Sequence, residues 1–225
     1  MIAIISDIHG NYPALKAVLQ EIDSMRIEKI ISLGAVAGYY CMVNECIDEL
    51  RRRNIINILG NHDSYLIGKG QCPRSMTVNK CIDYQKKIIT KKNLKYLAKS
   101  VEKLDTNLFS ARHGGWNDPL DEYISDFDFS IAENYFVHLF ISGHIHVQKK
   151  QTDGINTYFN PGGVGQPRDN DPRAAFAIID DNNEVHLHRV SYNIDEIANA
   201  MSKEGFESRL TDCLYKGTKI RTFGT

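Results

Sequence analysis

The feature that most constrains this fold is an apolar run that ends in metal-ligating side chains. Residues 2–5 are apolar, and beyond Ser6 come Asp7 and His9, before Gly10 and Asn11 break the pattern. Such a run predicts a buried strand, and the Gly-Asn pair predicts the loop that follows it. Ligands of open α/β sheets bind beyond the carboxyl ends of the strands. Asp7 and His9 are therefore candidate metal ligands, since a carboxylate with an imidazole suits Mn, Fe or Zn.

The same arrangement recurs at three more apolar runs, over residues 55–59, 108–112 and 137–142. Each run ends in Asn, Asp or His beside a glycine, at Gly60-Asn61-His62-Asp63, His113-Gly114 and Gly143-His144-Ile145-His146. Five of the eight histidines lie at these four ends, which chance placement does not explain. A sheet with parallel strands would bring the ends to one crevice, and this predicts a polynuclear metal site.

An alternation of strand and helix patterns predicts an α/β fold. Residues 12–22 read as an amphipathic helix, 29–33 as a strand and 45–53 as a second helix that Asn44 opens. This order favours right-handed crossovers and a largely parallel sheet. Helical spacing dominates residues 64–103, and residues 195–201 and 206–214 read as terminal helices. Strand patterns occupy residues 104–109, 137–142, 147–152, 157–159, 174–179 and 184–190. The close spacing of the later strands predicts an antiparallel meander.

These elements predict one domain over residues 1–225 with a helical insertion at about residues 64–103. The expected architecture is two facing mixed β-sheets flanked by helices, an α/β/β/α sandwich, with the metal site at the carboxyl ends of the strands. Apolar residues make up 42% of the chain and charged residues 24%, as is usual for a globular domain.

Charge and cysteine content limit the partners and the compartment. The net charge of −1 provides no general attraction to nucleic acid or to a membrane. The sequence has no apolar run of the length that spans a bilayer and no basic-then-apolar leader, so we expect neither a membrane anchor nor a secretory signal. Five cysteines, without C-x-x-C spacing, suit free thiols in a reducing cytoplasm.

The four strand ends resemble the metal motifs of the calcineurin-like metallophosphoesterases, most closely those of the small single-domain branch in bacteria and archaea. The stretch Asn160-Pro161-Gly162-Gly163-Val164-Gly165-Gln166-Pro167-Arg168 resembles the loop that follows the last metal motif of that branch. The resemblance extends from residue 1 to about residue 217. It implies hydrolysis of a phosphomonoester or phosphodiester by a hydroxide that bridges two divalent ions. Mn is the first expectation for these ions, with Fe, Zn or Ni as alternatives.

The same resemblance assigns roles to individual residues. It places one ion on Asp7, His9 and His146, and the other on Asn61, His113 and His144. His62 would lie beside the leaving oxygen, where it polarises the phosphate or donates a proton. Asp63 would orient the His62 imidazole and raise its basicity.

Position 35 departs from the family pattern. The family has Gly-Asp after its second strand, with the Asp bridging both metals, whereas this chain has Gly34-Ala35. Two divalent ions at the usual spacing repel by roughly 15–20 kcal/mol at an effective dielectric constant near 20, and the bridging carboxylate offsets part of this. We therefore expect Ala35 to weaken the second metal site and strongly reduce turnover of an otherwise intact enzyme. The alternative is a natural pseudoenzyme that binds a phosphorylated ligand or partner without turnover.

The expected substrate is a phosphorylated small molecule or nucleotide, and nucleic acid stays open as a partner, although a DNA-processing nuclease ranks last because the chain is not basic. The sequence leaves the oligomeric state open. Arg168, after Pro167, has two interpretations: an internal ion pair with Asp169 or Asp171, or a contact with substrate.

Some charged and histidine residues outside these motifs also carry expectations. The eight lysines between residues 80 and 103 read as a solvated helix face or, alternatively, as a cationic rim that attracts substrate. His138 lies within a predicted strand and is expected in the core or in contact with a helix. His186 and His188 share one face of a predicted strand and could be read as a metal pair, but they are expected at the surface.

Overall fold

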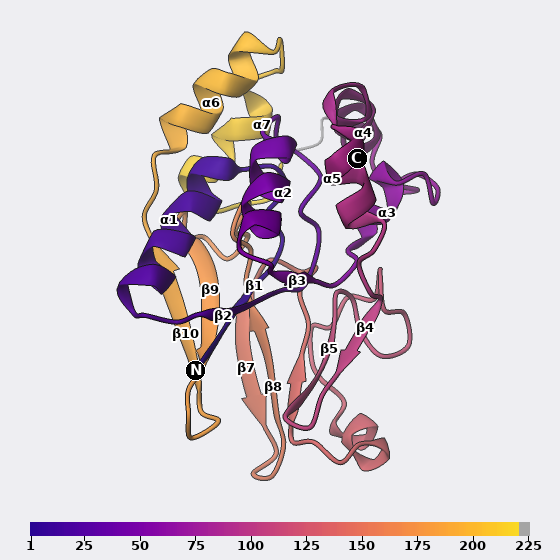
Figure 1. Ribbon diagram of the computed structural model, residues 1–225, viewed down its shortest axis with the longest axis vertical. Helices are drawn as coiled ribbons and strands as arrows, with labels where there is room; N and C mark the ends of the chain where they lie inside the picture. The colour runs from indigo at the N-terminus through magenta and orange to yellow at the C-terminus, as the bar shows by residue number, and fades with distance from the viewer. Residues whose placement is uncertain (221–225) are drawn as a thin grey trace.

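Two mixed five-stranded sheets form the centre of the molecule (Figure 1). The computed structural model describes residues 1–220, so the last five residues of the predicted domain lie outside it. The first sheet has the order β10-β9-β1-β2-β3, with β1 Ile2–Ile5, β2 Lys29–Ser32, β3 Ile56–Asn57, β9 Ala174–Ile179 and β10 Val185–Val190. The second has the order β4-β5-β6-β8-β7, with β4 Lys103–Asp105, β5 Phe109–Arg112, β6 Leu139–Ile141, β7 Gln148–Thr152 and β8 Thr157–Pro161.

Parallel strands occupy part of each sheet and are the strands that lead to the predicted ligands. In the first sheet β1, β2 and β3 are parallel, with Ile5 paired to Ser32 and Ser32 to Asn57. In the second sheet β5, β6 and β8 are parallel. The loops that leave the carboxyl ends of β1, β2, β5 and β6 carry Asp7, Ala35, His113 and His144, respectively. This topology brings segments that are far apart in sequence to one place.

The alternation of side chains along β1 divides the apolar core into two layers. Ala3 and Ile5 pack with the helices α1 (Tyr12–Ser24) and α2 (Val43–Arg52). Ile4 points to the opposite face and packs with Ile141 and Phe159 of the second sheet. The two sheets therefore face each other and the helices cover the outside of the first, as the alternating pattern of a strand requires. The predicted fold class is confirmed.

The outer face of the second sheet is covered mainly by the long connection between β5 and β6. This connection contains the 3₁₀ helix η1 (Phe129–Asn134) rather than α-helices. Its Phe127 ring stacks on Tyr158 with centroids 4.7 Å apart, and Trp116 lies edge-on to Phe140 at 5.5 Å. Aromatic packing thus completes the fourth layer.

Helices occupy most of the segment expected to be helical. They are α3 (Asn61–Leu66), α4 (Met76–Ile88) and α5 (Lys91–Leu97) (Figure 1). Cys81 and Tyr84 of α4 pack in one apolar cluster with α6 (Ile194–Lys203) and α7 (Arg209–Asp212). At the start of α1, the Asn11 side chain accepts a hydrogen bond from the Ala14 N–H at 3.3 Å, and Pro13 lies in the first turn. None of the helices in residues 1–220 combines the length and the apolar character that crossing a membrane requires.

Three predictions about strands and helix ends were wrong. The strand expected at residues 104–109 is split by a turn, because the Thr106 hydroxyl accepts hydrogen bonds from the backbone N–H groups of Leu108 and Phe109. The later strands do not form one meander, since β7–β8 is a hairpin of the second sheet and β9–β10 a hairpin of the first. The second helix begins at Val43, and the Asn44 side chain bonds the chain between α4 and α5 instead of opening the helix.

The histidines outside the predicted site are at the surface or partly covered. His138 is exposed, contrary to expectation, because β6 begins only at Leu139. Exposed His186 pairs with Asp180 at 2.8 Å, and half-buried His188 stacks on Phe176.

Candidate metal centre

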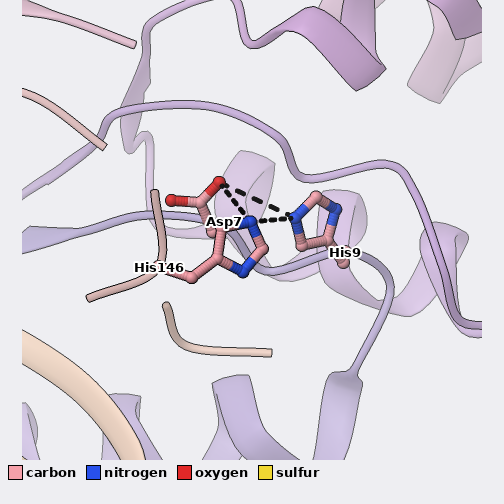
Figure 2. A group of neighbouring side chains, drawn as sticks. All are labelled: Asp7, His9 and His146. Atoms are coloured by element: carbon pink, nitrogen blue, oxygen red, sulfur yellow. Dashed lines mark hydrogen bonds and ion pairs between the residues drawn. The ribbon is translucent and has the colours of Figure 1, made fainter. Parts of the chain in front are cut away.

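Three ligand atoms converge beyond the carboxyl end of β1 (Figure 2). The His9 and His146 Nε2 atoms are 3.1 Å apart, and Asp7 Oδ1 lies 3.6 Å from the first and 3.3 Å from the second. All three residues are buried. A circle through the three atoms has a radius of about 1.9 Å, close to the bond lengths of about 2.0–2.2 Å that Zn²⁺ makes with nitrogen and oxygen ligands.

Backbone carbonyl groups fix which ring nitrogen of each imidazole is free. His9 Nδ1 lies 2.9 Å from the Ala37 carbonyl oxygen, and His146 Nδ1 lies 2.7 Å from that of Gln166. A carbonyl oxygen only accepts hydrogen bonds, so each Nδ1 carries the proton and each Nε2 presents a lone pair. Two lone pairs and a carboxylate oxygen facing one another repel unless a cation lies among them. This arrangement fits a divalent metal.

The Asp7 carboxylate is oriented so that one oxygen is free. Its Oδ2 accepts hydrogen bonds from the Ser6 hydroxyl at 2.7 Å and from the His144 backbone N–H at 2.9 Å. Its Oδ1 is buried and has no hydrogen-bond partner within residues 1–220. Buried polar atoms are nearly always hydrogen-bonded, so an orphaned carboxylate oxygen indicates a ligand position.

A second group of potential ligands lies beside the first. Asn61 Oδ1 is 3.1 Å from His113 Nε2, and His113 donates its Nδ1 proton to the Leu33 carbonyl at 2.8 Å. The His113 and His144 ring centroids are 5.2 Å apart. His144 Nε2 is buried and, in the part of the chain that the structure describes, has no hydrogen-bond partner. The six predicted ligands are therefore brought together as two adjoining groups of three.

The loop that carries Ala35 lies between these two groups. The Leu33 carbonyl holds His113, the Gly34 carbonyl accepts from the Asp7 N–H at 3.0 Å, and the Ala35 carbonyl accepts from the His9 N–H at 2.9 Å. Ala35 is fully buried and has a φ of 52°. This left-handed conformation costs a residue such as Ala on the order of 1 kcal/mol, whereas Asn and Asp adopt it more readily. The backbone at position 35 thus has a shape that suits the residue expected there.

Four of the ligands share this backbone conformation. The φ angles are 55° at Asp7, 54° at His9, 68° at His144 and 61° at His146. Non-glycine residues in this region are uncommon and cluster at functional sites, where the surrounding structure holds them. Here the sharp turns aim side chains from two sheets at one point.

Burial keeps the imidazoles in the neutral form that binds metal. Desolvation lowers the pKa of His144 to about 3 and holds the pKa of His146 well below its usual value. Burial alone would raise the pKa of Asp7, but the electrostatic effect of the neighbouring His146 and His9 imidazoles outweighs burial and holds this pKa well below its usual value. Asp7 is therefore ionised and His144 and His146 are neutral at neutral pH, as metal binding requires.

His62 and Asp63 lie in the first turn of α3, but they do not bond to each other as expected. The Asp63 carboxylate accepts the N–H groups of Ala37 at 2.9 Å and Gly60 at 3.1 Å, because it caps the start of the helix and ties down the neighbouring loop. Desolvation raises the pKa of Asp63 to about 6. His62 packs edge-on to His9 with ring centroids 4.6 Å apart, and its buried Nδ1 has no partner among the described residues.

A narrow cleft of about 80 Å³ opens onto both groups. Its walls include His62, His144 and His146, together with Tyr39, Arg74, Tyr123 and Arg168. Among residues 1–220, the two arginines supply the positive charge of this wall, and none of the eight lysines lines it. Tyr39, Arg74 and Tyr123 belong to the loops at residues 38–43, 65–76 and 114–123, from which substrate specificity is expected, although no motif marks the individual residues.

Arg168 is held at the cleft by neutral partners. It donates to Gln166 Oε1 at 2.7 and 3.0 Å and to the Tyr39 hydroxyl at 3.0 Å. The internal ion pair expected for it is wrong, because Asp169 pairs with Arg189 and Asp171 pairs with Arg173. Its charge stays available to an anion in the cleft.

Similarity to known proteins agrees with the metal-ligand geometry of this site. The sequence matches the profile of the calcineurin-like phosphoesterase superfamily domain over residues 1–184. The chain belongs to this superfamily. This calcineurin-like phosphoesterase is 31% identical to an uncharacterized protein of Methanocaldococcus jannaschii, over 96% of the chain and 98% of that relative. The family resemblance of the sequence is confirmed.

Solved structures agree with the fold. A metallophosphoesterase from Sphaerobacter thermophilus superposes with a TM-score of 0.84 and 30% identity, covering 96% of this chain and 99% of that one. A hypothetical protein from Pyrococcus horikoshii OT3 has a TM-score of 0.82 and 22% identity, covering 97% and 100% of the two chains.

Proposed function

We propose that this calcineurin-like phosphoesterase hydrolyses the phosphate ester of a small molecule or nucleotide with two divalent ions, preferably Mn. Asp7, His9 and His146 would hold one ion, and Asn61, His113 and His144 the other. The observation that carries the proposal is the convergence of Asp7 Oδ1 on two imidazole lone pairs, with no N–H among them.

The bound ions supply a nucleophile at neutral pH and neutralise charge on the phosphoryl oxygens. The protein contributes the positioning of the ester. Arg168 presents a guanidinium whose orientation is fixed by Gln166 and Tyr39, and such a fork suits phosphate oxygens. Its charge, together with that of Arg74, attracts an anionic ester to the cleft.

His62 is the candidate proton donor. Burial and the neighbouring His9 hold its pKa well below the usual value, so the ring is neutral and offers one N–H as a hydrogen-bond donor. A phosphoryl group beside the ring favours its charged form, and the protonated ring can then give its proton to the leaving oxygen.

The size of the cleft and the cysteines bear on substrate and compartment. A volume of about 80 Å³ is far below the roughly 300–1,000 Å³ of pockets that enclose a drug-sized ligand. The reacting phosphoryl group would enter the cleft, with the rest of the substrate outside.

All five cysteines are free and buried, which suits a cytoplasmic protein.

Ala35 should reduce turnover, because the loop that contacts both ligand groups lacks a carboxylate between them. The same observation supports the second candidate, a protein that binds a phosphorylated ligand without turning it over. A substrate screen separates the two. Mn-loaded protein and its Ala35→Asp variant are assayed on phosphomonoesters and phosphodiesters, with Asp7→Asn in the Ala35→Asp background as the inactive control.

We expect Ala35→Asp to hydrolyse at least one class, the control to lose this activity and the unaltered chain to be slower. Binding of phosphate esters by both proteins without hydrolysis would support the binding protein. An Ala35→Asp variant that carries two ions and neither binds nor hydrolyses any phosphate ester would contradict both candidates.

A further inference from the structure

We propose that Asp121 supplies an anionic ligand to the second metal, beside Asn61, His113 and His144. The inference rests on the proposed function for the presence of that metal. Asp121 Oδ1 lies 3.4 Å from His144 Nε2 and 3.1 Å from Asn61 Nδ2. No family motif of the sequence includes Asp121, which lies in the connection that follows His113.

The unpartnered nitrogen of His144 is the independent observation that points to a ligand. His144 is 4% exposed, and its Nε2 is buried without a hydrogen-bond partner in residues 1–220. The Asp121 oxygen is too distant for a good hydrogen bond to this nitrogen but is at a spacing typical of two atoms that share one metal. A cation between them would satisfy both atoms.

The loop is built to hold Asp121 in this place. The Asp118 carboxylate accepts the N–H groups of Leu120 at 2.9 Å and Asp121 at 3.2 Å. The loop also packs against Gly114, where a Cβ atom would lie 2.7 Å from the Asp121 nitrogen, so a side chain there would push the loop away. Asp121 therefore reaches the centre from a fixed backbone.

Charge explains why this chain needs the carboxylate. Asp7 gives the first ligand group an anion, but Asn61, His113 and His144 are neutral. A carboxylate at position 35 would serve both ions, and Ala35 removes it. Asp121 would restore one negative charge to the second group. It lies beside that group rather than between the ions, so it would retain the metal without restoring the bridge.

Arg74 is the competing partner of Asp121. Its guanidinium donates to Asp121 Oδ1 at 2.5 Å and lies over the Tyr123 ring at 5.5 Å. A carboxylate accepts several hydrogen bonds, so Arg74 and a metal can share it. If Asp121 only anchors Arg74, removing either partner should leave metal binding unchanged. If Asp121 is a ligand, its removal alone should weaken the second metal.

The test is a titration of metal-free protein with MnCl₂. Binding is monitored by isothermal titration calorimetry and by the electron paramagnetic resonance of Mn²⁺. We expect two binding steps, and Asp121→Asn should weaken the second by about 10–100-fold while leaving the first intact. Arg74→Gln should keep both steps. Asp126→Asn is the matched control, because that carboxylate lies in the same connection but pairs with Lys149.

The outcomes separate the inference from the proposed function. An unchanged second step in Asp121→Asn overturns the inference, whereas absence of any binding step in the unaltered protein overturns the metal-dependent function. In the Ala35→Asp background the same Asp121→Asn substitution should weaken the second step less, because a second carboxylate is present. An equal loss in both backgrounds would show that Asp121 acts through the fold, and this too would overturn the inference.

Discussion

Acidification of the metal-free protein should destabilise it sharply between about pH 7 and pH 5.5. His62, His144 and His146 are buried with pKa values well below 6.5, so in the folded protein they stay neutral through this range. In the unfolded chain they take up protons near pH 6.5. The unfolded state therefore binds more protons, and the free energy of unfolding falls as the pH falls.

The magnitude follows from proton linkage. Each histidine that stays neutral when folded lowers the free energy of unfolding by about 1.2 kcal/mol across this interval, and three of them by about 4 kcal/mol. Asp63 partly offsets this loss. Its pKa of about 6 means that the folded state takes up a proton at a higher pH than the unfolded state does, which raises the free energy of unfolding by about 0.8 kcal/mol across the interval. His9 adds to this loss, because burial lowers its pKa as well. A net loss of about 3 kcal/mol, without His9, corresponds to a fall in Tm of roughly 6–12 °C for a chain of this size.

Thermal unfolding of chelator-treated protein, followed by circular dichroism at both pH values, measures the effect. His62→Gln should reduce the loss by about 1.2 kcal/mol, since it removes one of the three groups without removing a predicted ligand. Saturating Mn should raise Tm at pH 7, because the ion binds the folded state. A free energy of unfolding that changes by less than about 1 kcal/mol between the two pH values would refute the assignment of neutral, buried imidazoles.

Three substitutions test individual residues. In the Ala35→Asp background, His62→Ala should lower turnover by roughly 10²–10⁴-fold with metal content nearly unchanged, and loss of metal would instead make His62 a ligand. Arg168→Lys should raise KM for a phosphate ester without changing Tm, because lysine lacks the planar fork, and an unaltered KM would assign Arg168 a structural role. Gly38→Ala should lower both Tm and metal uptake, because its φ is 146° and a Cβ there would lie 2.1 Å from His9 Nδ1; a normal Mn stoichiometry in that variant would contradict the packing.

The sequence was most informative where local pattern and site coincide. Apolar runs that end in Asp7, Asn61, His113 and His144 predicted both the central strands and the residues that meet beyond them. A buried strand is apolar, and a polar metal ligand at its end breaks the apolar run. One stretch of sequence therefore predicts both the strand and the position of the ligand. The fold class followed from the same runs.

Features that depend on distant partners were not predictable in this way. Close spacing predicted antiparallel pairing of neighbouring late strands, as seen in β7–β8 and β9–β10. It could not show that β9 leaves the second sheet to pair with β1, which is remote in sequence. Asp121 lies in an irregular loop whose course depends on the packing around Gly114. The Asp63 carboxylate accepts a hydrogen bond from the backbone N–H of Ala37, in a loop remote in sequence, instead of pairing with His62 as expected.

One side chain at position 35 is expected to govern both the metal pair and turnover. The direct test measures bound Mn and ester hydrolysis in the same samples of this chain, Ala35→Asp and Ala35→Asn, all loaded and desalted identically. Asn suits the left-handed backbone but carries no charge, so it separates relief of strain from charge. We expect Ala35→Asp to gain bound Mn and turnover together and Ala35→Asn to gain much less. Equal stoichiometry and equal turnover in all three proteins would contradict it.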